Sequence, residues 1–124
     1  MLGNARVATR IPTRDIERAR RFYSEKLGLE PVEERPGGLL YRCSSGAFVL
    51  FESSGSSPGT FTQMAFDVDD IDAVVADLER RGVELEYGGV AEVEGNYPSK
   101  GGRGERAVWI RDSENNLLGI GQSL

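Results

Sequence analysis

Carboxylates and phenols are the side chains that could carry acid–base chemistry in this chain, because the sequence contains no histidine. Without imidazole, serine–histidine and cysteine–histidine nucleophile systems are excluded, as are the common histidine-bearing sites for zinc, iron and nickel. Glu52, Asp67 and Tyr97 are therefore the candidate general acids or bases if the protein is an enzyme. Alternatively, each of these side chains simply lines a water-filled cavity or lies in a solvent-exposed loop.

Three arginines and one glutamine are candidate polar contacts for a ligand. Arg10, Arg42 and Arg111 could grip a carboxylate or phosphate with their paired N–H donors, and Gln63 could orient a further polar group. The alternative is that these guanidinium groups pair with the two carboxylates named above inside the protein, since buried guanidinium groups need partners.

Two aromatic residues, Phe48 and Trp109, could stack on a planar ligand, although aromatic side chains also serve as plain core filling. Cys43 is the only cysteine, which excludes an internal disulfide, and we expect an ordinary semi-buried thiol. An oxygen-only metal site built from Gln63, Glu52 and Asp67 would suit magnesium or manganese, but their spacing does not specifically support it.

The elements that must position these residues occur twice. Residues 7–12 alternate like a strand, residues 15–26 show helical spacing, and short strands are predicted at 31–33, 39–43 and 47–52. A polar connector at 53–60 separates this unit from a second one. That second unit contains a strand at 61–68, a helix at 70–80, and strands at 83–87, 107–112 and 117–121.

Simple offsets align the two halves of the chain. A shift of 55 brings Asp15 onto Asp70, whereas a shift of 69 brings Arg42 onto Arg111 and Leu50 onto Gly119. The difference places an insertion in the long segment 87–106, which we expect to be a lid or a dimer contact. Tyr97 lies in this inserted segment.

Each half reads strand–helix–strand–strand–strand, which predicts an α+β fold. Two βαβββ modules would form an eight-stranded cup-shaped sheet with the helices outside. We expect a single domain over residues 1–124, with module 1 at about 5–53 and module 2 at about 61–124.

Strand alternation assigns residues to the two faces of that sheet. The side expected under the helices holds Val7, Thr9, Ile11, Thr62, Met64, Phe66, Val108 and Ile110. The side expected inside the cup holds Ala8, Arg10, Leu40, Arg42, Phe48, Leu50, Glu52, Gln63, Ala65, Asp67, Trp109, Arg111, Leu117, Gly119 and Gly121.

Several motifs resemble the vicinal oxygen chelate superfamily, which includes glyoxalases, bleomycin resistance proteins and extradiol dioxygenases. The first is Ile-Pro at 11–12 followed by the helix 15–23 and Lys-Leu-Gly-Leu at 26–29. The second module agrees at 65–71, and the hairpin 110–117 is similar to the family's Arg-Asp-Pro-Asp-Gly-Asn turn, with Ser113 and Asn115 replacing the proline and glycine.

The resemblance implies a divalent metal held by histidines and glutamates on the first and last strands of each module. The corresponding positions here are Ala8, Gln63, Leu50 and Gly119, none of which is a good metal ligand. Gly119 also cannot act as the base that a last-strand glutamate supplies in glyoxalase-type members. The resemblance therefore points to the metal-free, drug-sequestering branch, whose members are acidic dimers.

Composition narrows the possible partners. The chain has 124 residues with 15 basic and 20 acidic side chains, for a formal net charge of −5. This charge argues against nucleic acid and anionic membranes as partners. No signal-like start or membrane-length apolar run is present, so we expect a cytoplasmic protein.

The leading hypothesis is a metal-independent small-molecule binding protein without a cofactor, sequestering an antibiotic or metabolite that is aromatic or anionic. We expect a homodimer, because the edges of shallow sheets can pair across subunits. The alternatives are a glyoxalase-like lyase, an isomerase or a dioxygenase-type enzyme with an atypical oxygen-ligand site, and an accessory subunit.

Overall fold

The computed structural model describes residues 1–94 and 103–124 and contains eight strands and two α-helices in these ranges. A short 3-10 helix, η1 (Leu2–Asn4), precedes the first module. Module 1 contains β1 (Thr9–Thr13), α1 (Ile16–Leu27), β2 (Glu33–Arg35), β3 (Gly38–Arg42) and β4 (Ala47–Glu52). Module 2 contains β5 (Thr62–Asp67), α2 (Ile71–Arg80), β6 (Ala91–Glu94), β7 (Gly104–Arg111) and β8 (Leu117–Ser123).

Both predicted helices are confirmed, and each begins with the same aspartate cap. The side chain of Asp15 accepts a hydrogen bond from the Arg18 amide at 3.0 Å, and that of Asp70 accepts one from the Ala73 amide at 3.1 Å. These bonds satisfy amide donors that the first turn of a helix leaves open. Gly28 ends α1 in the left-handed conformation, with φ of 68°, which suits a residue without a Cβ.

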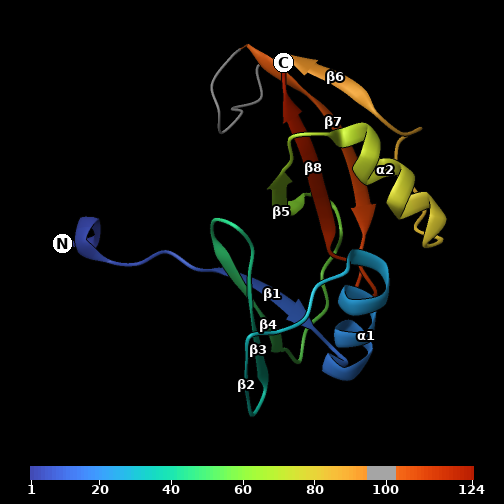
Figure 1. Ribbon diagram of the computed structural model, residues 1–124. Helices are drawn as coiled ribbons and strands as arrows, with labels where there is room; N and C mark the ends of the chain where they lie inside the picture. The colour runs from blue at the N-terminus through green and yellow to red at the C-terminus, as the bar shows by residue number, and fades with distance from the viewer. Residues whose placement is uncertain (95–102) are drawn as a thin grey trace.

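The α+β class and the repeated βαβββ order are confirmed. The eight strands form two four-stranded sheets, in the orders β1-β4-β3-β2 (sheet 1) and β5-β8-β7-β6 (sheet 2). The edge strands β1 and β5 lie together, and the side-chain amide of Gln63 donates to the Arg10 carbonyl at 3.3 Å. Figure 1 shows both helices on the same side of the molecule.

One hydrophobic core runs through both modules. The Tyr23 ring on α1 lies 5.8 Å from Phe48 on β4, and Phe48 lies 6.1 Å from Phe66 on β5, measured between ring centroids. Buried Ile110, Leu118 and other side chains of sheet 2 belong to the same cluster. The two modules therefore bury their apolar faces against each other as well as under their own helices.

The predicted strand at 83–87 is wrong. The Glu86 amide donates to the Trp109 carbonyl at 2.8 Å, but no ladder of hydrogen bonds follows from it. Tyr87, Gly88 and Gly89 all have positive φ, which breaks an extended strand. The second strand of module 2 is instead β6, which pairs antiparallel with β7.

The predicted face of β4 is also wrong: Phe48 and Leu50 lie in the core, 2% and 0% exposed, beneath α1. Four residues, 43–46, join β3 to β4, whereas five, 112–116, join β7 to β8. Because of the extra residue, equivalent positions on β4 and β8 differ by 70 in residue number and not by 69. Val49, and not Leu50, therefore corresponds to Gly119. A shift of one residue turns every side chain of a strand to the opposite face.

Two further face assignments differ from the prediction. Thr62 lies on the side away from the helices, because a bulge between Thr62 and Met64 shifts the register of β5. Val7 precedes β1 and is 97% exposed rather than buried. No helix among the described residues is long and apolar enough to cross a bilayer.

Candidate functional site

Each sheet has one face turned away from the helices, which we call its open face. On sheet 2 the open face is built around β8, where Gly119 lies between Ala65 and Trp109, and Gly121 lies between Asp67 and Ala107. The absence of side chains on these two glycines leaves a pocket of about 300 Å³. Such a volume lies at the lower end of the range for small-molecule sites.

Trp109 forms one wall of this pocket and is held in a defined orientation. Its indole N–H donates to the hydroxyl of Thr62 at 3.1 Å, across β8. The Tyr87 ring packs edge-on against the indole, with 6.2 Å between ring centroids. A Cβ on Gly119 would approach the indole nitrogen to 3.3 Å, so the glycine is what lets the ring lie close to the strand. Trp109 is thus placed as a rigid aromatic wall, on the face that strand alternation predicted for it.

Carboxylates border the other end of the pocket. Asp67, at the end of β5, lines the pocket from one side and is exposed. Glu105, on β7, lies over Gly121: a Cβ on that glycine would lie 2.7 Å from the Glu105 carboxyl carbon. The pocket therefore combines an aromatic wall at one end with acidic groups at the other.

Arg111 shares the open face of sheet 2 but is engaged in the structure. Its Nε donates to Glu86 at 2.7 Å, and one terminal nitrogen donates to the Gly59 carbonyl at 2.8 Å. These bonds join β7 to the connector between the modules and to the segment after α2. Arg111 therefore pairs with a carboxylate inside the protein, which was the alternative to ligand binding. Its partner is Glu86, whereas Glu52 and Asp67 were the expected partners.

Arg10 and Arg42 lie on the open face of the other sheet. Arg10 pairs in register with Val49, and both line a recess of about 340 Å³ together with Leu40 and Phe51. Arg42 is on the same face, at the end of β3, and is exposed. The structure therefore brings Arg10 and Arg42 to one sheet and Trp109 and Asp67 to the other.

The remaining sequence candidates are dispersed. Phe48 is a core residue, and Gln63 lies at the seam between β1 and β5. Glu52 ends β4 and lines a surface recess beside α1, away from Asp67. Tyr97 lies outside the described residues.

The metal expected from the resemblance does not fit the side chains at the matching positions. With β4 aligned to β8 by the observed register, these positions are Ala8, Gln63, Val49 and Gly119. Only the glutamine offers an oxygen, as a neutral amide. Within 1–94 and 103–124, no three Cys, Asp or Glu side chains gather into a cluster that could hold an ion.

Two residues of this pocket were missed by sequence reasoning. Glu105 could have been found, because strand alternation extended backwards from Trp109 and Ala107 reaches it on the same face. Thr62 could not have been found by alternation, since the bulge reverses its face. The small residues Gly119 and Gly121 are on the predicted face.

The fold is shared with solved structures of low sequence identity. A glyoxalase/bleomycin resistance protein/dioxygenase from Alicyclobacillus acidocaldarius is 20% identical, with a TM-score of 0.74 over 98% of this chain and 92% of that one. An antibiotic-binding protein from a Streptomyces species is 24% identical, with a TM-score of 0.66 over 94% and 93%. A lactoylglutathione lyase from Agrobacterium tumefaciens is 21% identical, with a TM-score of 0.68 over 96% and 93%.

No protein with a curated description matches the chain. The model of the Glyoxalase/Bleomycin resistance protein/Dioxygenase superfamily matches residues 5–119, nearly the whole length. With the repeated βαβββ modules described above, this match shows that the chain belongs to the Glyoxalase/Bleomycin resistance protein/Dioxygenase superfamily.

Proposed function

We propose that this protein binds a small planar molecule on the open face of sheet 2 and does so without a metal. The observation that supports this most directly is the glycine floor of β8 beside the fixed indole of Trp109. A flat floor and a rigid aromatic wall favour a planar, partly apolar ligand. The similarity in fold to an antibiotic-binding protein is consistent with sequestration of an antibiotic or a metabolite.

The polar groups around the two open faces narrow the ligand class. Asp67 and Glu105 border the pocket of sheet 2, so an amino or hydroxyl donor on the ligand is favoured there. Arg10 and Arg42 do not line this pocket; they stay candidate contacts for an anionic group on the open face of sheet 1. Arg111 holds the connector in place through Gly59 and acts as a positioning residue.

Replacing Trp109 with alanine is the test of this proposal. We expect the affinity for a planar aromatic ligand found by a thermal-shift screen to fall roughly 30-fold, the scale of a well-packed aromatic anchor. Affinity is measured by calorimetry, with and without a chelator. The variant Val32→Ala, at a residue 59% exposed outside both open faces, is the control and should bind normally.

Two results would contradict the proposal. If Trp109→Ala binds as tightly as the parent protein, the ligand does not lie on this wall. If chelation abolishes binding and one added metal equivalent restores it, the metal-independent mode is wrong.

We also propose that the protein acts in the cytoplasm, because an exposed lone thiol such as Cys43 stays reduced there.

We further propose that the protein is a homodimer. The segment before β1 extends away from the body in Figure 1, and Leu2 and Val7 are 75% and 97% exposed. Apolar side chains on an extended arm favour contact with a second copy. Light scattering should give twice the chain mass, and removal of residues 1–7 should lower that mass toward one chain. A parent protein with the mass of one chain would refute the dimer.

A further inference from the structure

The internal repeat creates two equivalent joints, each where the helix of one module meets the β-hairpin of the other. Tyr23 on α1 and Leu78 on α2 are equivalent, because each stands eight residues after its aspartate cap. Each also accepts a backbone bond at 2.9 Å, from Leu29 and Val83 respectively. In the hairpins, Asp112 and Cys43 are equivalent, because each is the first residue after its strand.

The joint at Tyr23 is closed. The Tyr23 ring fills it, and the phenol hydroxyl donates to Asp112 at 2.7 Å. Ile11, Ala19 and Leu50 pack around this position and are all 0% exposed. A tyrosine ring thus fills the whole space between α1, sheet 1 and the hairpin of module 2.

The joint at Leu78 is open, because smaller side chains stand at two of the equivalent positions. Leucine replaces the tyrosine and Cys43 replaces Asp112, which removes both the ring and its hydrogen-bond partner. Phe66, Val74 and Ile120, the counterparts of Ile11, Ala19 and Leu50, border a pocket of about 220 Å³. Phe66 and Val74 are only partly buried, unlike their fully enclosed counterparts.

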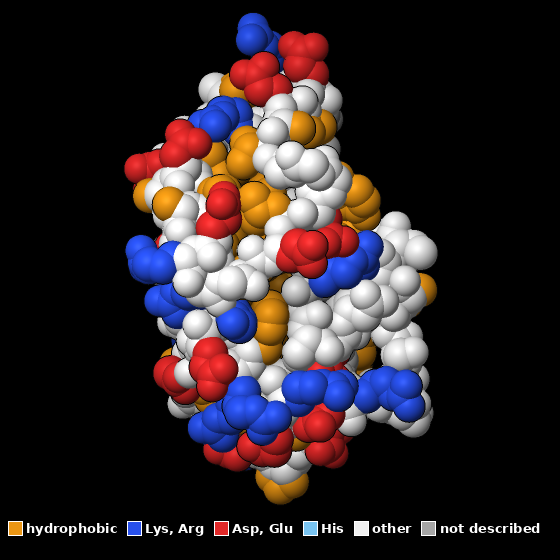
Figure 2. All heavy atoms as spheres, turned by 90° about the vertical axis from the view of Figure 1, so that its right-hand side faces the viewer, with side chains coloured by type: hydrophobic (Ala, Val, Ile, Leu, Met, Phe, Trp, Pro, Cys, Tyr) orange, Lys and Arg blue, Asp and Glu red, His pale blue; other side chains and the backbone are white. Residues whose placement is uncertain are grey.

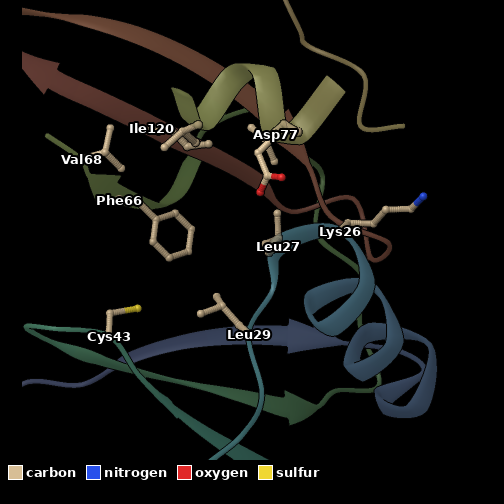
Figure 3. A pocket seen from close by; sticks show the side chains of 10 residues that line it. Lys26, Leu27, Leu29, Cys43, Phe66, Val68, Asp77 and Ile120 are labelled. Carbon is tan, nitrogen blue, oxygen red and sulfur yellow. The ribbon is translucent and has the colours of Figure 1, made fainter. Parts of the chain in front are cut away.

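The lining side chains of this pocket come from both modules. In Figure 3 the ring of Phe66 and the thiol of Cys43 point into it, whereas Lys26 points away. Figure 2 shows the helical side of the molecule, where hydrophobic side chains gather in a band bordered by charged ones. The pocket lies on the helical side of the sheets, opposite the open face that carries Trp109, and Phe66 and Ile120 border the pockets on both sides.

We propose that the open joint is a second binding site, for a small aromatic molecule whose ring takes the place that the Tyr23 ring has in the closed joint. The lining is predominantly apolar, and the pocket is larger than the roughly 150 Å³ cavity that holds benzene in a well-studied protein. A ring of tyrosine size therefore fits, with Phe66 as its stacking surface. Asp77 carries the carboxylate at the rim, and Arg80 and Arg81 pair with it.

The probe is p-cresol, which is the tyrosine side chain as a free molecule. We expect a Kd of about 0.1 to 1 mM for a ligand of this size. At about ten times that concentration the Tm should rise by about 5 °C, because the ligand binds the folded state. Alkylation of Cys43 by iodoacetamide should slow at least fivefold, since bound ligand covers the thiol.

The variant Leu78→Phe carries a ring on α2 into this space. We expect it to abolish the thermal shift with p-cresol and to leave the Tm of the free protein equal or higher. Cys43→Ser should keep the thermal shift, because the pocket and not the thiol binds the ring. If Leu78→Phe does not fold, protection of Cys43 in the parent protein still decides the question.

This site is tested independently of the open face. Trp109→Ala should leave the thermal shift and the protection by p-cresol unchanged, whereas Leu78→Phe should leave binding of the planar ligand unchanged. The proposal is overturned if p-cresol gives neither shift nor protection. It is equally overturned if Trp109→Ala removes both effects while Leu78→Phe does not.

Discussion

Replacing Asp112 with alanine is expected to lower the free energy of unfolding by about 3 to 5 kcal/mol. The Asp112 carboxylate is buried, and four groups donate to it at 2.7 to 2.9 Å. The donors are the Tyr23 hydroxyl, the amides of Glu114 and Asn116, and the Asn116 side chain. Alanine would remove this acceptor from all four, and only the Asn116 side chain has a second one, the Pro12 carbonyl at 2.9 Å. Urea unfolding monitored by circular dichroism measures the change.

The repeat supplies a matched control for this variant. Cys43 stands at the equivalent position of the open joint, is exposed, and has a shorter neighbour in Leu78. Cys43→Ala should therefore change the free energy of unfolding by less than about 1 kcal/mol. Equal losses for the two variants would show that the closed joint does not hold the modules together.

Replacing Glu114 with glutamine is expected to lower the free energy of unfolding by about 3 kcal/mol at neutral pH. Burial alone would raise the pKa of this carboxyl group, but hydrogen bonds outweigh it and lower the pKa to about 2. Arg18 donates twice, at 2.8 and 3.0 Å, and the backbone amides of Asp15 and Arg14 donate at 3.0 and 2.9 Å. The carboxylate of module 2 thereby binds the first turn of α1 in module 1.

The pH dependence of stability has a definite sign. The pKa of Glu114 is lower in the folded chain than the ordinary value of 4.5, so its contribution is present above that value. The contribution is lost as the pH falls from about 4.5 through about 2. Burial raises the pKa of Asp112, and its protonation in acid acts in the opposite direction. The difference between the parent protein and Glu114→Gln isolates the first effect.

The control for charge removal is Glu34→Gln. Glu34 pairs with Arg20 at 2.9 Å on the surface, and its side chain is 59% exposed. Such pairs contribute little to stability, so a change below about 0.5 kcal/mol is expected. If the stability difference between parent and Glu114→Gln stays constant from pH 7 down to pH 2, the proposed role of the Glu114 carboxylate is wrong.

The repeated order of strands and helices was predictable, because its signals are local. Asp15 and Asp70 each precede a helical apolar stripe, and Gly28 follows the first one. These signals act through hydrogen bonds between residues three positions apart, which a sequence displays directly. The wall residue Trp109 and the floor residue Gly119 were also placed on the correct face by strand alternation.

Other assignments depended on single residues whose effect is not local. The hairpin 112–116 of module 2 has one residue more than the hairpin 43–46 of module 1, so aligning the two modules by a single offset misplaces Phe48, and the bulge beside Thr62 reverses the start of β5. Periodicity cannot reveal either, because each changes the register of a strand relative to its neighbour. The residues Arg10 and Trp109 share a predicted face in the sequence but lie on different sheets.

By itself, the sequence determined the α+β class, the two βαβββ modules and the absence of histidine, because these follow from residue types and short-range spacing. Only the tertiary structure decided which groups meet. Arg111 is held by Glu86, Glu114 binds the opposite module, and the two joints differ in whether a ring fills them. These contacts join residues far apart in the chain, and their geometry is set by how two cores pack against each other.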